Sequence, residues 1–175
     1  MNQNQSTSGK DAARQMKNVI ELLRASRFDE AKVICEQILQ GDADNVDAIY
    51  ALGWIALYQK NMPTALEAFN RVIALKPDHS RAHNNLGWIL MQSSDALGAT
   101  KYFEAAIALE PSLREAYANL GACLLILAKH QEARDVFQKA IDLVPDDSMM
   151  RANLAAINHL TGEQSELLPG NRTVT

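Results

Sequence analysis

Two histidines are spaced as a metal-binding pair would be. His79 and His83 stand four residues apart, a spacing that places two imidazoles on one face of a helix. Asp78 is the only further ligand nearby, while His130 and His159 are isolated. A zinc site in a protein takes at least three protein ligands. We therefore expect no metal site.

No other arrangement of side chains is typical of catalysis. The sequence holds no glycine-rich phosphate loop, no Ser-His-Asp set and no Cys-His pairing. Its two cysteines, Cys35 and Cys123, lie in apolar helical runs, which favours small buried thiols over reactive ones or a disulfide. We expect a protein that is not an enzyme and that has no catalytic residue and no cofactor.

A series of asparagines offers binding chemistry. Asn85, Asn119 and Asn153 recur at a constant interval along the sequence. One amide supplies a donor and an acceptor, so it matches a peptide unit without reading side chains. The alternative is that these amides cap or bridge helices. The sequence leaves both interpretations open, and Ala51 stands where the series would begin.

Aromatic residues form a second candidate set. Trp54 and Trp88 are separated by the same interval as the asparagines, and Tyr50 lies one helical turn before Trp54. Exposed aromatic side chains are favoured anchors in protein interfaces. The alternative is that they pack between neighbouring helices as part of the core.

Composition excludes several classes of function. The chain has 175 residues, 47% of them apolar and 22% charged, which is typical of a folded soluble protein. The net charge of -4 has the wrong sign for general nucleic-acid binding. The first ten residues have no apolar core of a secretory signal, and no segment approaches the ~20 apolar residues of a membrane span. We expect a cytoplasmic protein without direct membrane insertion.

The elements that position these residues follow from a repeat of about 34 residues. Four kinds of residue recur at that period: Gly53, Gly87 and Gly121; Ala65, Ala99 and Ala133; Phe69, Phe103 and Phe137; Pro77, Pro111 and Pro145. Self-similarity at such a period indicates a stack of identical supersecondary units, not a globule with one core. Each unit divides into two amphipathic helices, and its proline ends the second one.

The period divides the chain into seven parts. We expect a disordered tail over 1–11, a degenerate unit over 12–45, complete units over 46–79, 80–113 and 114–147, a C-terminal capping helix over 148–160 and a disordered tail over 161–175. In the degenerate unit Val19, Cys35 and Ala43 replace the Gly, Phe and Pro. A capping box at Ser112 and Glu115 is expected to begin one first helix.

Packing explains why these residues recur. Two helices of a hairpin approach closely only where side chains are small, so we expect Gly87 to face Ala99. We expect Phe103 and its equivalents to fill the seam between neighbouring units, where truncation to Ala would cost about 3–5 kcal/mol. A helical glycine costs about 1 kcal/mol relative to Ala, so its recurrence indicates a compensating contact.

The motif resembles the tetratricopeptide repeat. In the unit 80–113 it comprises Leu86-Gly87, Ala99, Phe103, Ala106 and Pro111, and the units on either side agree in phase. The resemblance covers residues 12–160. It departs from the family pattern where Lys60, Ser94 and Ala128 replace the turn glycine between helices. The resemblance implies an all-α fold, a right-handed α-solenoid of about nine helices paired in antiparallel hairpins.

The same resemblance implies a concave groove that holds an extended peptide or a partner helix. The residues expected to bind the partner there are Tyr50, Trp54, Arg81, Asn85, Trp88, Asn119 and Asn153. The asparagines are similar to the ladder in the repeats of O-linked N-acetylglucosamine transferase, where amides hold the backbone of an extended chain.

A carboxylate clamp for chaperone C-termini is a further family motif, and the sequence fits it poorly. The clamp needs Lys and Asn in one unit, Asn in the next, and Lys and Arg in the third. Tyr50 and Trp54 stand at its first positions and Glu115 at a basic one, so that only Asn85 fits. Moving the window one unit earlier places Arg81 at a basic position. We expect no clamp.

The function expected from the sequence is that of a non-catalytic adaptor or scaffold that binds a protein or peptide partner. Three alternatives remain open. The first is a dedicated chaperone for a secreted client. The second is a scaffold that forms homo-oligomers through its repeat ends, and the third is a regulatory subunit of a modifying enzyme. No nucleic-acid partner is expected.

Overall fold

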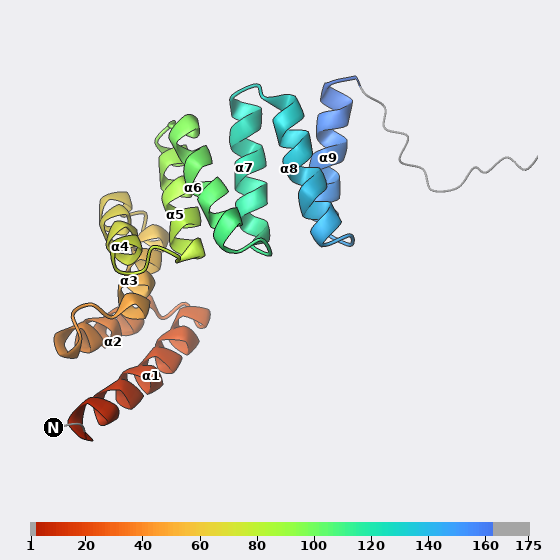
Figure 1. Cartoon of the computed structure of the whole chain (residues 1–175). Coiled ribbons are helices and arrows are strands. Elements are labelled where there is room, and N and C mark those ends of the chain that lie inside the picture. Colours follow the sequence, from red (N-terminus) through yellow and green to blue (C-terminus); the bar gives the residue numbers. More distant parts are fainter. Residues whose placement is uncertain (1–2, 163–175) are drawn as a thin grey trace, which may run out of the picture.

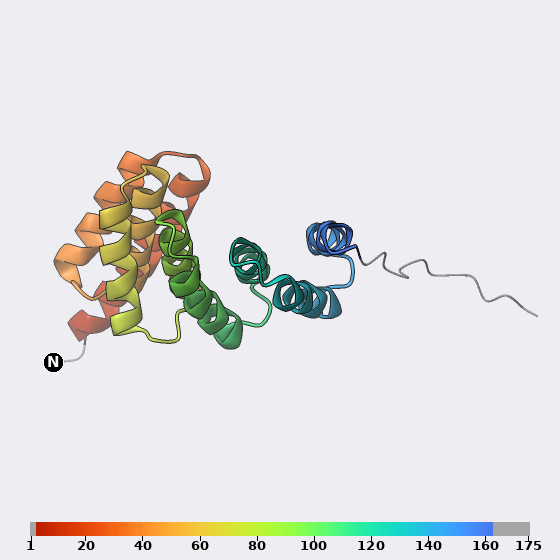
Figure 2. The ribbon, with the colours of Figure 1, turned by 90° about the horizontal axis from the view of Figure 1, so that it is seen from above.

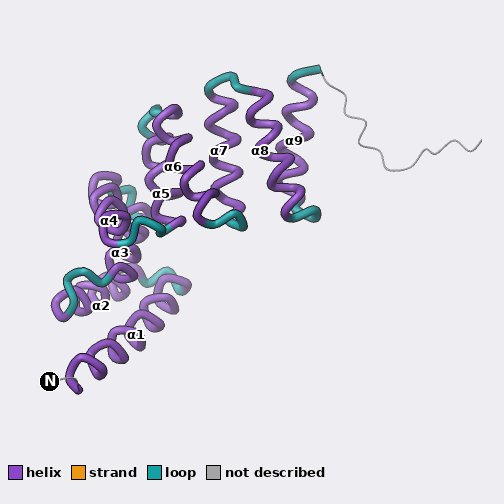
Figure 3. The backbone as a smooth tube through the Cα atoms, in the orientation of Figure 1, coloured by secondary structure: helices purple, strands orange, loops and turns teal. Residues whose placement is uncertain are grey.

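The computed structural model describes residues 3–162, with side chains from residue 11 on, and this range contains nine helices and no strand. Each helix packs against the next, so the hairpins form an open row and confirm the expected all-α solenoid (Figures 1 and 3). The helices are α1 (Gln3–Arg24), α2 (Phe28–Gly41), α3 (Val46–Tyr58), α4 (Met62–Leu75), α5 (Ser80–Gln92), α6 (Ala96–Leu109), α7 (Arg114–Ile126), α8 (His130–Leu143) and α9 (Ser148–Leu160).

The helix boundaries follow the repeat, except at the N-terminus. Helices α3, α5, α7 and α9 begin at the first residues of the units expected from the period. Helix α1, however, begins at Gln3, where we expected a disordered tail over 1–11. Once later turns of α1 are packed, each added residue extends an existing helix without a nucleation cost. The tail expected at 161–175 lies, beyond the turn at 161–162, outside the described residues.

Buried side chains form three successive clusters rather than one core. The first joins α1, α2 and α3 around Val19, Cys35 and Ile55. The second is centred on Phe69, and the third extends from α6 to α9 around Phe103 and Phe137. Seen from above, the helices follow one another along a row, so each cluster is shared only by neighbours (Figure 2). Within residues 3–162 no helix has the length and apolar composition of a membrane span.

The contact that closes each complete hairpin joins the repeated glycine to the repeated phenylalanine. A Cβ at Gly53 would lie 2.9 Å from Phe69 Cε1, and one at Gly87 would lie 2.7 Å from Phe103 Cε1. Gly121 meets the ring of Phe137 in the same way. The group nearest to Gly87 is therefore the ring of Phe103. The ring occupies the space left by the absent glycine side chain, because it is the larger group on the facing helix.

The turns between paired helices keep their geometry without glycine. Ser26, Lys60, Ser94 and Ala128 adopt left-handed conformations with φ of 57°, 59°, 65° and 58°. This region costs an L-residue about 1–2 kcal/mol. The cost occurs at four turns because, at each of them, packing of the two helices that it joins fixes the conformation of the turn.

From α3 on, the N-cap of each first helix is the residue that precedes the unit. Asn45 accepts from the amide of Ala48, His79 from Ala82, and Asp147 from Met149 and Met150. The expected capping box at Ser112 and Glu115 is not formed. The N-cap is Leu113, which makes no side-chain capping bond. Leu113 is 6% exposed, so its burial sets the start of α7 one residue later than the capping box would.

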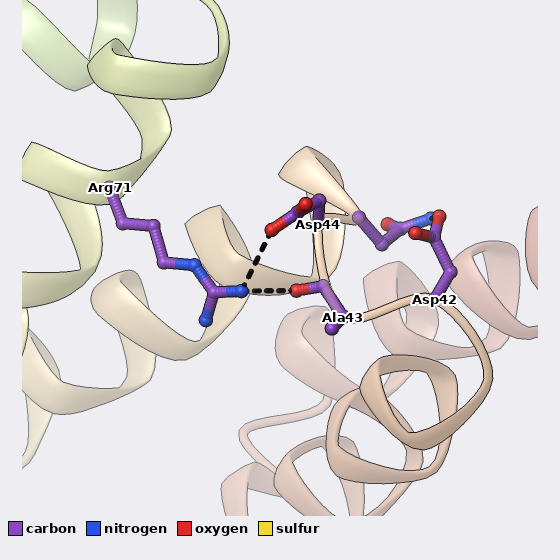
Figure 4. Close-up of polar contacts among 5 residues, drawn as sticks. Asp42, Ala43, Asp44 and Arg71 are labelled. Carbon is purple, nitrogen blue, oxygen red and sulfur yellow. Dashed lines mark hydrogen bonds and ion pairs between the residues drawn. The ribbon is translucent and has the colours of Figure 1, made fainter.

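An arginine joins the degenerate unit to its neighbour. Arg71 of α4 donates to the carbonyl oxygen of Ala43 at 2.5 Å and pairs with Asp44 Oδ1 at 3.0 Å (Figure 4). Ala43 stands where the complete units have proline. The side chain of Arg71 thereby holds a loop that lacks the rigid proline ring.

The last helix carries the expected features of a cap. Met150, Leu154 and Ile157 are buried against the third cluster. Arg151 and Ala155 of α9 are exposed, whereas the equivalent residues of the preceding unit, Tyr117 and Gly121, are covered. In the described part of the chain no helix follows α9 to cover that face.

The strained turns yield a stability prediction. Ala128→Gly should raise the free energy of unfolding by roughly 0.5–1 kcal/mol, because glycine adopts a positive φ without a Cβ clash. Urea unfolding followed by circular dichroism measures the change. Ala156→Gly is the matched control on the exposed face of α9, where glycine should instead destabilise by about 1 kcal/mol. A loss of stability at position 128 equal to that at position 156 would contradict the assignment.

Candidate functional site: a groove between α1, α3 and α5

A groove of about 800 Å³ lies between the first helices of the first three units. Helices α1 and α3 form its walls, and the loop from α4 to α5 closes one end. The residues that line it are Met16, Val19, Ile20, Leu23, Arg24, Asp47, Tyr50, Ala51, Trp54, Lys76, Asp78, His79, Ser80 and Arg81. A volume of this size suits a ligand or several side chains of a bound peptide.

The groove walls are apolar and partly exposed. Along α1, Met16, Ile20 and Leu23 follow one another at helical spacing, and Tyr50 and Trp54 do so along α3. Ile20 is 45% exposed and Trp54 is 37% exposed. Large apolar side chains exposed together on a surface mark an interaction site more often than a single one does.

An aromatic cluster continues the wall beyond Trp54. Phe28 at the start of α2 lies 5.9 Å from Trp54 and 3.9 Å from Tyr58, measured between ring centroids. Trp54 and Tyr58 are stacked at 6.2 Å. Tyr58 is 59% exposed and borders a second hollow of about 320 Å³. The apolar surface therefore extends from α1 across α3 to the start of α2.

Tyr50 connects the groove to the next unit. Its ring stacks on the imidazole of His79 at 4.7 Å, and its hydroxyl accepts from Asn85 Nδ2 at 3.2 Å. Burial raises the pKa of Tyr50, while the Asn85 hydrogen bond and Arg81 act in the opposite direction. The phenol therefore stays protonated at neutral pH, and its own proton remains available to an acceptor in the groove.

Charged side chains stand at both ends of the groove. Arg24 lies in the last turn of α1, whereas Lys76, Asp78 and Arg81 lie near the start of α5, opposite Asp47 in the first turn of α3. Among the residues that the structure describes, Arg24, Lys76 and Arg81 form no ion pair. The cationic groups of the groove are thus free to meet a partner.

Only some of the residues expected to bind a partner line the groove. Tyr50, Trp54 and Arg81 line the groove, and Asn85 reaches it through Tyr50. Trp88 is half-buried against the second and third core clusters. Its packing matches the alternative interpretation of a core residue.

The asparagines connect neighbouring helices. Asn85 Nδ2 donates to Tyr50 of the preceding first helix, and Asn119 Nδ2 donates to Asn84 Oδ1 at 3.0 Å. Asn153 is half-buried on α9. Two of the three amides therefore make the bridging contacts that the sequence left open as an alternative to holding a peptide backbone.

Sequence reasoning missed the contribution of α1. Ile20, Trp54 and Trp88 stand at equal intervals along the sequence. Ile20 is therefore the residue of the degenerate unit that is equivalent to the two tryptophans. That spacing would have identified it. Leu23 and Arg24 also line the groove, and no repeated landmark marks them.

The residues weighed as metal or redox groups have structural roles. His79 Nδ1 caps α5, and His83 Nε2 lies 2.8 Å from the carbonyl oxygen of Pro77. Among the described residues no three His, Cys, Asp or Glu side chains gather as metal ligands would. Cys35 and Cys123 are buried free thiols, and burial raises the pKa of Cys35 to about 11. The groove offers contacts for binding. Ser80 and His79 both line it, but the Ser80 hydroxyl donates to Glu110 and His79 Nδ1 accepts from the amide of Ala82.

The cap at His79 predicts a pH dependence of stability. Burial, with Lys76 and Arg81, lowers the pKa of His79 below its ordinary value of 6.5. The unfolded chain therefore binds the proton more tightly, so the stabilisation is complete above pH 6.5 and is lost as pH falls through the folded pKa. His79→Asn keeps a capping acceptor without titrating and should lose less stability between pH 7.5 and 5.5, as measured by urea unfolding. His159→Asn on the exposed face of α9 is the control, and an equal effect there would contradict the assignment.

The amide bridge predicts a second stability change. Asn85→Ala removes the hydrogen bond to Tyr50 and should lower the free energy of unfolding by about 1 kcal/mol. Asn70→Ala removes the same amide from an exposed position of α4 and corrects for the change in helix propensity. If chemical denaturation gives equal values for the two variants, the bridge contributes nothing.

Comparisons with known proteins agree with this architecture. Two family models described as Tetratricopeptide repeat match the chain, one over residues 22–89 and the other over residues 84–148. A curated relative, DnaJ homolog subfamily C member 7 of Mus musculus, is 31% identical over 61 residues. The match spans 35% of this chain and 12% of that protein. It therefore bears on the repeats and not on the remainder of the relative.

Solved structures share the fold at low identity. The structure of pilF from Pseudomonas aeruginosa has a TM-score of 0.82 and 21% identity, and covers 90% of this chain and 72% of its own. The structure of YrrB, described as a TPR protein with an unusual peptide-binding site, has a TM-score of 0.70 and 18% identity, and covers 90% of this chain and 81% of its own. Likeness at these identities concerns the arrangement of helices.

Proposed function

Because this chain belongs to the tetratricopeptide repeat family, we propose that it is a non-catalytic adaptor that binds a segment of a partner protein in the groove between α1, α3 and α5. Repeats of this kind support protein interaction in general. The observation that carries the proposal is the exposure of Ile20 and Trp54 on opposite walls of one groove.

Burial of the apolar side chains that line the groove favours binding there. Water leaves apolar side chains when a partner covers them, and burial of each square ångström contributes about 25 cal/mol. Tryptophan and tyrosine are frequent anchors because they bury a large area with few rotatable bonds. Trp54 and Tyr58 present such rings beside the aliphatic wall of α1. The solved structure of YrrB supports the proposal because its own description includes a peptide-binding site.

Selection of binding peptides tests the proposal. A random peptide library displayed on phage is selected on the immobilised chain, and the enriched peptides are measured by fluorescence anisotropy. Trp54→Ala should weaken them at least tenfold, which corresponds to about 1.4 kcal/mol. Ile20→Ala on the opposite wall should weaken them as well.

The control removes an exposed apolar side chain outside the groove. Leu97 on α6 is 61% exposed and does not line the groove, so Leu97→Ala should change the dissociation constants less than about twofold. Circular dichroism verifies that every variant is folded. Enriched peptides that bind the Trp54, Ile20 and Leu97 variants equally well would refute binding in the groove.

A further inference from the structure

The structure narrows the kind of segment that the groove accepts, an inference that rests on the proposed function. We infer that the occupant is an amphipathic helix that lays its apolar face between α1 and α3 and places a carboxylate against Arg24, rather than an extended peptide.

An extended peptide brings unpaired backbone groups into a groove, and these groups need donors and acceptors there. Two of the amides that would supply them each use a hydrogen of Nδ2 for a bond to a neighbouring helix. Asn85 donates to Tyr50, and Asn119 donates to Asn84. On α3 the equivalent position is the buried Ala51, which offers no side-chain polar group. Between its charged ends, the part of the lining that α1 and α3 supply offers a strand only the Tyr50 hydroxyl and the Trp54 indole as polar groups.

A helix satisfies its own backbone and needs only side-chain contacts. The two walls are rows with helical spacing. Met16, Ile20 and Leu23 are four and three residues apart on α1, and Tyr50, Trp54 and Tyr58 are each four apart on α3. Ridges of this spacing accept the ridges of a third helix between them. An apolar stripe at i, i+3 or i+4 and i+7 has the matching period.

Charge sets the polarity of the occupant at one end of the groove. Arg24 stands in the last turn of α1, and no acid lines the groove beside it. The acids that do line it, Asp47 and Asp78, lie with Lys76 and Arg81 around the first turns of α3 and α5. Because α1, α3 and α5 alternate with antiparallel partners, these first turns lie at the end opposite to Arg24. A carboxylate beside Arg24 thus meets a cation without an opposing acid.

Three synthetic peptides of roughly 14 residues, or four helical turns, test the inference against the full chain. The acidic probe consists of leucine on one helical face and glutamate and alanine elsewhere. The basic probe has lysine for every glutamate. The proline probe keeps the acidic composition but replaces two interior alanines by proline, which prevents a continuous helix. Fluorescence anisotropy gives each dissociation constant.

The acidic probe should bind at least about tenfold more tightly than the proline probe, and Trp54→Ala should abolish the difference. Arg24→Glu should weaken the acidic probe about fivefold and strengthen the basic probe. Lys101→Glu makes the same charge change on the exposed surface of α6, away from the groove, and should alter neither probe. Circular dichroism of the variants verifies folding.

Each contrary result overturns one step. Equal or tighter binding of the proline probe refutes a helical occupant, and equal effects of Arg24→Glu and Lys101→Glu refute the carboxylate contact. Absence of saturable binding of the acidic probe refutes the inference as a whole. If phage-selected peptides depend on Trp54 but are extended or basic, the adaptor proposal stands and only this inference fails.

Discussion

The contact between a glycine and a phenylalanine ring is the constraint on which each complete hairpin depends. The ring of Phe69, Phe103 or Phe137 lies where a glycine Cβ would be, so any side chain at the glycine would displace it. All three rings are at most 1% exposed. This contact compensates the cost of glycine within a helix, about 1 kcal/mol. It also fixes how closely the paired helices approach, and hence the direction in which the next unit begins.

The degenerate unit meets the same constraint with other residues. Val19 stands in place of glycine and Cys35 in place of phenylalanine, and both are fully buried in the first cluster. The larger residue has moved to α1 and the smaller one to α2, so that the total volume between the helices is shared differently. Close packing of interiors makes such an exchange necessary. The exchange leaves α1 in place to form one wall of the groove.

Polar contacts then position the first helices relative to each other. Asn85 bonds to Tyr50, Tyr50 stacks on His79, and His79 caps α5. These contacts span α3 and α5 at the closed end of the groove. Because these contacts use the Asn85 amide and the Tyr50 ring for structure, the surface left to a partner is mainly apolar, with Arg24 at one end and side chains of both charges at the other. The side chains that remain available for binding are therefore those that the contacts between α3 and α5 do not use.

The sequence by itself determined the repeat, the helices and the kind of residue at each seam. A constant period identifies Gly87, Phe103 and Pro111 as equivalents of residues in neighbouring units, because every unit meets the same packing problem. It did not show that the ring of Phe103 is the group nearest to Gly87, since spacing places residues on a helix face without naming the partner across it. Leu113 likewise became the N-cap because its burial outweighed the capping box at Ser112.

Only the tertiary structure decided which members of a series are accessible. Trp54 and Trp88 share one position of the repeat, yet Trp54 lines a groove beside α1 while Trp88 packs against two core clusters. The asparagines were equally ambiguous until their acceptors on neighbouring helices were known. A repeat fixes where a side chain begins on its own helix. What that side chain meets depends on the residues of the next helix, which differ from unit to unit.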